Sequence, residues 1–178
     1  MELIQADNFW MRLRIRMLYN SAFPLSERKP FKRILEMQKK GKTDIWYIVH
    51  DGKFVGMATT VNSDDIVMVD YFAVDKRHRS KGLGTLAFRE ILDTYRDKGV
   101  FVEIEAVDAA ADNAVERIRR KRFYCRCGLS DFGVSAKVFG VEMELLGIRC
   151  LLDYDGYVGF YRDNLSKFAA DHISPVKR

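Results

Sequence analysis

The sequence predicts an α/β fold built on one mixed, partly parallel sheet with helices on both faces. Three observations lead to this prediction. Asp51-Gly52 lies between two apolar runs and is a turn pair that favours a two-residue β-hairpin. A strand, a helix and a second strand follow within residues 66–107, the pattern of a βαβ unit with parallel strands. The chain has 178 residues and shows no repeat or linker, so one domain over residues 1–178 is expected.

The first half of the chain is expected to contain a strand, two helices and three further strands. Residues 1–7 fit a short strand, and Phe9–Ser21 carries apolar residues at helical spacing. Pro30 suits the first turn of a helix that extends to Lys40. The three strands are Ile45–Val49, Lys53–Val61 and the almost wholly apolar Ile66–Val74.

The second half is expected to contain two helices, a strand and two β segments. In chain order these are Gly84–Lys98, Val100–Val107, Asn113–Cys127 and Leu129–Ile148, the last with a break near Gly140. Gly99 and Gly128 supply stop signals after the two helices. The tail from Leu151 onward is rich in Tyr, Gly and Asp and indicates neither a helix nor a strand.

The composition is that of a globular protein and restricts its partners only modestly. Hydrophobic residues make up 48%, charged residues 31%, and the net charge is +5. This basic excess suits an anionic small molecule, a nucleic acid or an acidic surface. The longest uncharged stretch, Phe54–Ser63, is too short to cross a bilayer, and no secretory leader is visible, so we expect a cytoplasmic protein. The three cysteines lack metal-ligand spacing, which predicts free thiols and no metal.

A glycine-rich loop is the strongest chemical signal in the sequence. After the apolar strand ending at Val74, the chain spells Arg-x-x-Gly-x-Gly from Arg79 to Gly84. Glycine lets the backbone approach a phosphate closely, and the free amides of the following helix point at the anion. The basic side chains of Arg79 and Lys81 can offset part of a diphosphate charge. The loop therefore predicts binding of a diphosphate-containing cofactor.

A dinucleotide-binding fingerprint is the main alternative for this loop. Gly82, Gly84 and Ala87 match Gly-x-Gly-x-x-Ala, and the acidic Glu103 lies downstream. In that fold, however, the first glycine directly follows the strand. Here the charged segment Asp75–Lys81 separates them, which disfavours an NAD(P)-type protein.

Three motifs together resemble the GNAT N-acetyltransferase superfamily. Phe72-Ala73-Val74 followed by the Arg79–Gly84 loop is similar to the family's cofactor motif. Val102-Glu103-Ile104 resembles the family's Leu-Glu-Val on the next strand, and residues 123–129 resemble the family's Leu/Phe-Tyr-x-x-x-Gly-Phe. Order and spacing agree over roughly residues 45 to 147. Two departures are that Asn113 precedes Tyr124 by one helical turn more than is usual and that Leu129 replaces the usual Phe.

The resemblance implies an enzyme that transfers an acetyl group from acetyl-CoA to a primary amine without a covalent intermediate. It implies these cofactor-binding residues: Phe72, Ala73, Val74, Arg79, Lys81, Gly82, Leu83, Gly84, Thr85 and Asn113. A backbone N–H of Phe72 or Ala73 is expected to face the thioester carbonyl. Tyr124 is expected to protonate the departing sulfur, and Glu103 matches the position of the base best. Glu105 on the same strand face and Asp70 on the neighbouring strand remain alternatives for the base.

Other functions stay open at this point. The protein could be a non-catalytic acyl-CoA-binding module. The basic run Glu116–Arg122 could contact nucleic acid, although a solvated helix is the favoured interpretation. The expected acceptor is a small-molecule or peptide amine whose identity the sequence does not disclose. No membrane partner is expected, and a homodimer is neither favoured nor excluded.

Overall fold

A computed structural model describes residues 1–176, which form two compact units. Unit 1 comprises Met1–Asn62 and Val69–Arg96, and unit 2 comprises Ser63–Met68 and the chain from Asp97 onward. The expectation of a single domain stays a prediction. No helix among the described residues is long and apolar enough to span a bilayer.

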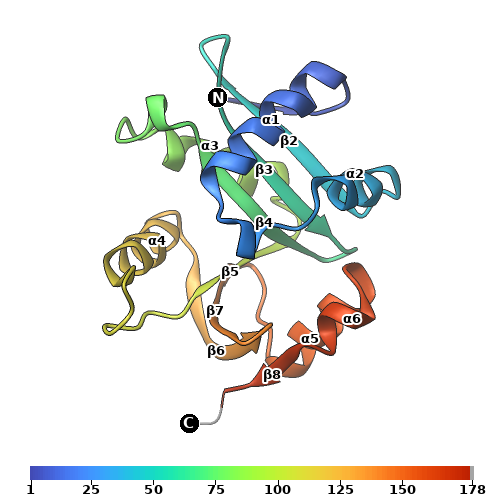
Figure 1. Cartoon of the computed structure of the whole chain (residues 1–178), viewed down its shortest axis with the longest axis vertical. Coiled ribbons are helices and arrows are strands. Elements are labelled where there is room, and N and C mark those ends of the chain that lie inside the picture. The colour runs from blue at the N-terminus through green and yellow to red at the C-terminus, as the bar shows by residue number, and fades with distance from the viewer. Residues whose placement is uncertain (177–178) are drawn as a thin grey trace. The chain divides into compact units, whose positions relative to one another are not determined.

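Unit 1 contains the N-terminal strands and the first three α-helices (Figure 1). Its elements are β1 (Glu2–Gln5), α1 (Phe9–Ala22), α2 (Phe31–Lys39), β2 (Thr43–His50), β3 (Lys53–Asn62), most of β4 (Ile66–Val74) and α3 (Leu83–Thr94). Short 3-10 helices form at Leu25–Glu27 and Lys76–His78.

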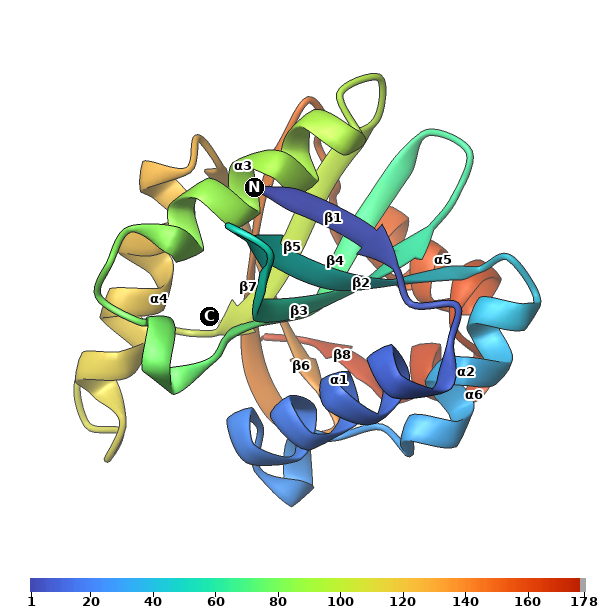
Figure 2. The same ribbon diagram turned by 90° about the horizontal axis from the view of Figure 1, so that it is seen from above.

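Local sequence explains how unit 1 is assembled. The predicted hairpin is confirmed, because β2 pairs antiparallel with β3 around Asp51 and Gly52, whose φ angles of 50° and 69° suit a two-residue turn. Helices α1 and α3 cover opposite faces of the unit 1 strands (Figure 2). Ile15, Leu18 and Tyr19 of α1 pack into the buried core of this unit.

Unit 2 contains the remaining strands and helices. Its elements are the first residues of β4, β5 (Gly99–Glu105), α4 (Ala114–Arg126), β6 (Ser130–Val138), β7 (Val141–Ile148), α5 (Tyr154–Asn164), α6 (Lys167–Ala170) and β8 (Ile173–Pro175). Gly140, with φ of 86°, lies in the tight β6–β7 connection where the break was predicted.

The strand pairings confirm the mixed sheet. Hydrogen bonds connect the eight described strands in the order β1-β2-β3-β4-β5-β7-β6-β8. The start of β4 pairs parallel with β5, as the βαβ pattern predicted. β5 pairs antiparallel with β7, and β6 pairs antiparallel with β7 and β8.

Two expectations about the second half need correction. Helix α3 ends at Thr94, and Gly99 begins β5 rather than stopping a helix. A Cβ atom on Gly99 would overlap the Cβ of Cys150, so close packing explains this glycine. The tail, for which the sequence indicates neither a helix nor a strand, forms α5, α6 and β8. Helix α5 begins at an Asp153 cap whose carboxylate accepts a hydrogen bond from the Gly156 amide.

Candidate active site

The glycine-rich loop connects β4 to α3 inside unit 1. Ser80 and Gly82 have φ angles of 60° and 75°, and Gly82 is the residue that caps α3. This left-handed backbone costs glycine little and strains other residues. Because β4, this loop and α3 follow one another in the chain, the predicted cofactor residues within Phe72–Val74 and Arg79–Thr85 lie in one strand–loop–helix segment.

The start of α3 presents backbone amides that suit an anion. Leu83 and Gly84 occupy the first turn, where N–H groups have no intrahelical acceptor. The amide of Thr85 donates to the Gly82 carbonyl at 3.0 Å, so it is already engaged. The helix dipole adds favourable charge at this end, and Lys81 is exposed beside it. These features fit the diphosphate of a nucleotide cofactor, with Thr85 contributing less than its neighbours.

The charged segment before the glycines is held by its own side chains. Asp75 caps the short 3-10 helix by accepting from the Arg77 amide at 3.0 Å, and its carboxylate pairs with the Arg77 guanidinium at 2.7 Å. These bonds lower the pKa of Asp75 to about 2. Arg79 Nε donates to the Val74 carbonyl at 3.0 Å, which folds the loop back onto β4. This intervening helix separates β4 from Gly82, unlike the direct strand-to-glycine turn of a dinucleotide fold.

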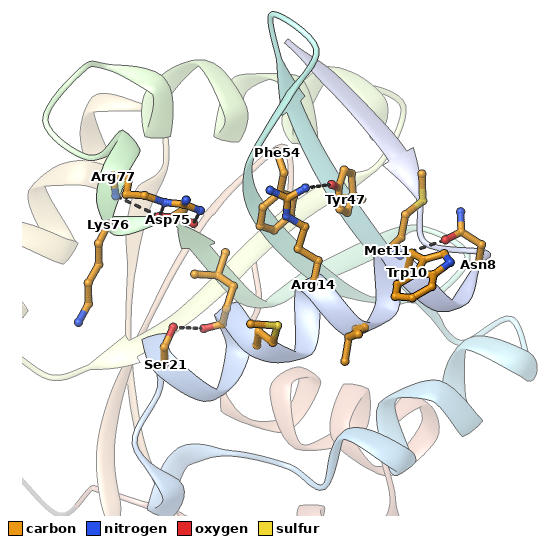
Figure 3. A pocket seen from close by; sticks show the side chains of 13 residues that line it. Asn8, Trp10, Met11, Arg14, Ser21, Tyr47, Phe54, Asp75, Lys76 and Arg77 are labelled. Carbon is orange, nitrogen blue, oxygen red and sulfur yellow. Dashed lines mark hydrogen bonds and ion pairs between the residues drawn. The ribbon is translucent and has the colours of Figure 1, made fainter.

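A groove of about 940 Å³ lies beside this segment in unit 1. It is lined by the exposed face of α1, by Tyr47 and Phe54, and by Asp75–Arg77. Figure 3 shows Arg14 extending from α1 toward Phe54 and Tyr47. Its guanidinium lies 5.3 Å from the Phe54 ring centre and donates to the Tyr47 hydroxyl at 3.4 Å. Trp10, which also lines the groove, is 75% exposed. Most of the lining is aromatic or apolar, and few acidic groups are among it.

Glu103, the predicted base, lies on β5 in unit 2 and is only partly buried. Its carboxylate accepts hydrogen bonds from two tyrosines of α5. The Tyr161 hydroxyl lies 2.7 Å from both carboxylate oxygens, and the Tyr157 hydroxyl bonds Oε2. Both tyrosines are buried. Sequence reasoning missed them because they lie in the tail that was given no element. Their spacing of one helical turn, with the Asp153 cap before them, was the available signal.

Glu105, the first alternative, belongs to a charged network in the same unit. Its carboxylate pairs with Arg117 at 3.0 Å and Arg120 at 3.3 Å, and it accepts a hydrogen bond from the side-chain Nδ2 of Asn113 at 3.2 Å. The side-chain Oδ1 of Asn113 in turn accepts a hydrogen bond from Arg117 Nε at 2.7 Å. The structure thus places Asn113 beside Glu105, where it orients the arginine and the acid.

Asp70, the second alternative, lies in unit 1 and pairs with the ammonium of Lys29 at 2.7 Å. Next to it, the Tyr71 hydroxyl donates to the Glu27 carbonyl and accepts from the Lys29 amide. Burial raises the pKa of Tyr71 well above its usual value. Asp70 and Tyr71 therefore fasten the segment between α1 and α2 to β4.

Tyr124, the predicted acid, is buried on α4 in unit 2. Burial raises the pKa of its phenol to about 12, against an opposing effect of Arg120. The phenol therefore keeps its proton at neutral pH, as a proton donor requires.

Part of the basic run on α4 is neutralised inside unit 2. Arg117 and Arg120 pair with Glu105, and Lys121 binds Asp131 at 2.8 Å and Glu144 at 2.6 Å. Burial lowers the pKa of Lys121, but its two acidic partners outweigh that effect and raise it. These cations are consequently less available to a nucleic acid than the sequence alone indicates. Within residues 1–176, no cluster of three or more acids, histidines or cysteines could hold a metal ion.

Comparisons with known proteins agree on one family. A family model described as the acetyltransferase (GNAT) family matches residues 12–129. No curated protein matches the sequence significantly.

Solved structures supply the remaining similarities. A Bacteroides thetaiotaomicron protein assigned to the GNAT acetyltransferases superposes with a TM-score of 0.76 at 18% identity, covering 95% of this chain and 97% of that one. The ribosomal-protein-S18-alanine N-acetyltransferase of Escherichia coli gives 0.62 at 14% identity, covering 85% and 94%. A Bacillus subtilis acetyltransferase in complex with CoA gives 0.57 at 15% identity, covering 84% and 97%.

Proposed function

Since the chain belongs to the GNAT acetyltransferase family, we propose that it transfers the acetyl group of acetyl-CoA to a primary amine by direct attack. The observation that carries the proposal is the glycine loop of unit 1, where open amides at the start of α3 follow the end of β4. A coenzyme A diphosphate carries the charge and size that such a helix start accommodates.

Each group of residues has its own task in this reaction. Unit 1 binds the cofactor through Phe72–Val74 and the loop from Arg79 to Thr85, with a backbone N–H of Phe72 or Ala73 donating to the oxyanion. Glu103 and Tyr124 are the proton-transfer groups, and Asn113 assists at the cofactor. The amine nitrogen bonds to the thioester carbon as the carbon–sulfur bond breaks. Glu103 receives the amine proton, directly or through water, and Tyr124 gives its proton to the departing thiolate.

We propose that the amine acceptor binds in the unit 1 groove, whose lining favours an amine with an apolar body. Its lining is mainly aromatic and aliphatic, and the one acid among its described lining residues, Asp75, is paired with Arg77. Arg14 and Lys76 add positive charge. A polyamine or an aminoglycoside would meet repulsion there, whereas an apolar amine or a peptide would bury apolar surface. We therefore expect phenylethylamine or an apolar peptide N-terminus to react faster than spermidine.

A thermal-shift measurement followed by an amine panel tests the proposal. Acetyl-CoA at a hundred times its Kd should stabilise the protein by about 2.7 kcal/mol, whereas NAD should give no shift. Thiol release in the presence of each amine then reports turnover. A shift with NAD alone would favour the dinucleotide alternative. Binding of acetyl-CoA without turnover on any amine would favour a non-catalytic module.

Two glycine variants separate loop function from backbone strain. Gly82 and Gly41 have φ angles of 75° and 70°, and a Cβ atom added to either glycine would meet no other atom within 4 Å. Gly82→Ala and Gly41→Ala should therefore cost similar stability, about 1 kcal/mol each. Only Gly82→Ala should raise the Kd for acetyl-CoA, and equal affinities in the two variants would contradict a role for the loop.

A further inference from the structure

We infer that Tyr157 and Tyr161 are positioning residues that hold the Glu103 carboxylate in its reactive orientation. This inference rests on the proposed function, in which Glu103 accepts the proton of the amine. It adds to that function a part of the chain beyond residue 129, where the family match ends.

The geometry of α5 carries the inference. Tyr157 and Tyr161 are four residues apart, so both face β5 from one side of the helix. Their rings are fixed by neighbours: Tyr157 and Tyr161 lie 5.1 Å apart between ring centres, and Phe101 lies 6.4 Å from Tyr157 and 5.0 Å from Phe160. Buried rings with few alternative rotamers bring their hydroxyls to one place.

The two hydroxyl donors leave the Glu103 carboxylate able to accept a further proton. A phenol has one proton to donate, and a carboxylate has about four lone-pair sites, so two phenols do not saturate it by themselves. The Tyr161 hydroxyl lies between both oxygens, and Tyr157 bonds only Oε2. Because both donors are neutral, they orient the acid without cancelling its charge.

Hydroxyl-deletion variants test the inference, since phenylalanine keeps the ring packing. Tyr157→Phe and Tyr161→Phe should each lower kcat about threefold to tenfold, the usual effect of losing one hydrogen bond. The KM for acetyl-CoA should stay unchanged. Tyr154→Phe is the matched control, because Tyr154 lies on the same helix and its hydroxyl donates to the Ile173 carbonyl at 3.2 Å. Its kcat should equal that of the wild type.

The decisive measurement repeats these substitutions in a Glu103→Gln background, with the best amine of the panel as acceptor. If the tyrosines act through Glu103, removing their hydroxyls there should lower kcat by less than about twofold further. Equal losses in both backgrounds, or a kcat loss in Tyr154→Phe as large as in the other two, would overturn the inference. So would tyrosine variants with wild-type kcat.

Failure of the inference can be distinguished from failure of the proposed function. If Glu103→Gln retains full kcat while the wild type acetylates amines, the positioning role is refuted and the acetyltransferase function stands. If the wild type neither binds acetyl-CoA nor turns over any amine, the proposed function fails and the inference fails with it.

Discussion

Glu103 and Glu105 lie on one face of β5, two residues apart, yet different helices supply their described hydrogen-bond partners. Glu105 contacts two arginines and an asparagine of the α4 region, and Glu103 contacts two phenols of α5. Two arginines compensate the charge of the Glu105 carboxylate. Two phenols donate hydrogen bonds to the Glu103 carboxylate, and these two donors add no positive charge beside it. Two acids on one face of a strand thus differ in their contacts, and the difference comes from the helices beside them.

The largest expected effect is the difference in kcat between the Glu103 and Glu105 variants. Glu103→Gln should lower kcat about a hundredfold or more, as removal of a general base commonly does. Glu105→Gln should change kcat less than about threefold. Steady-state kinetics with the same amine and saturating acetyl-CoA compare them, and similar losses in both variants would contradict the distinction.

A second prediction concerns Tyr124, which lies on the same helix as the arginines of Glu105. Tyr124→Phe should lower kcat about tenfold to a hundredfold, because the thiolate would leave without a proton donor. The pKa of Tyr124 is raised to about 12, so in the wild type this phenol should cause no fall in kcat up to about pH 10. A pH–rate profile and the variant's kcat check both statements, and an unchanged kcat would remove Tyr124 from the mechanism.

A third prediction concerns stability in the charged network. Glu105→Gln should lower the free energy of unfolding by about 1–3 kcal/mol, because it leaves the largely buried Arg117 without its counter-charge. Adding Arg117→Met should recover part of this loss. Urea unfolding measures both.

The exposed pair of Lys32 and Glu36, 3.9 Å apart, is the control for this network. Glu36→Gln should cost less than about 0.5 kcal/mol, because water screens an exposed pair. A loss at Glu105 as small as the loss at Glu36 would show that its network adds nothing to stability.

The smallest effect is expected at Asp75, whose cationic partner is exposed. The pKa of Asp75 is about 2 in the folded protein against 3.8 ordinarily, so its ionised form stabilises the fold above pH 4. That contribution is lost as the pH falls toward 2. Asp75→Asn should therefore destabilise by about 1 kcal/mol or less at pH 7, and the difference from wild type should shrink by pH 3. Unfolding at both pH values measures it, and a difference that grows in acid would contradict the assignment.

Much of the fold could be predicted because local signals agreed with the final structure. The strand at 66–74 has the predicted bounds, and the Asp51-Gly52 turn sets the hairpin. Gly99 was wrongly predicted to stop a helix, because a glycine required for packing against Cys150 resembles a stop signal. The α5 helix was not predicted, since its glycines and aspartates favour turns locally and its buried tyrosines are stabilised by distant contacts.

The glycine loop could be predicted from the sequence, whereas the choice of base could not. The loop from Arg79 to Gly84 could be read because backbone chemistry requires glycine at fixed spacing. The choice among Glu103, Glu105 and Asp70 could not be made, because it depends on partners far away in the chain. Lys29, Arg117 and Tyr161 lie in segments that no motif connects to these acids.

The position of α5 has a practical consequence for anyone trimming the gene. A fragment designed to end with the family match at residue 129 would omit β6 and β7 and also the helix that anchors Glu103. Extending the fragment through β7 would restore the strand beside β5 but still discard both phenols. Expression boundaries should therefore extend past Asn164. Low activity of a shorter fragment would result from the truncation and would not describe the full-length protein.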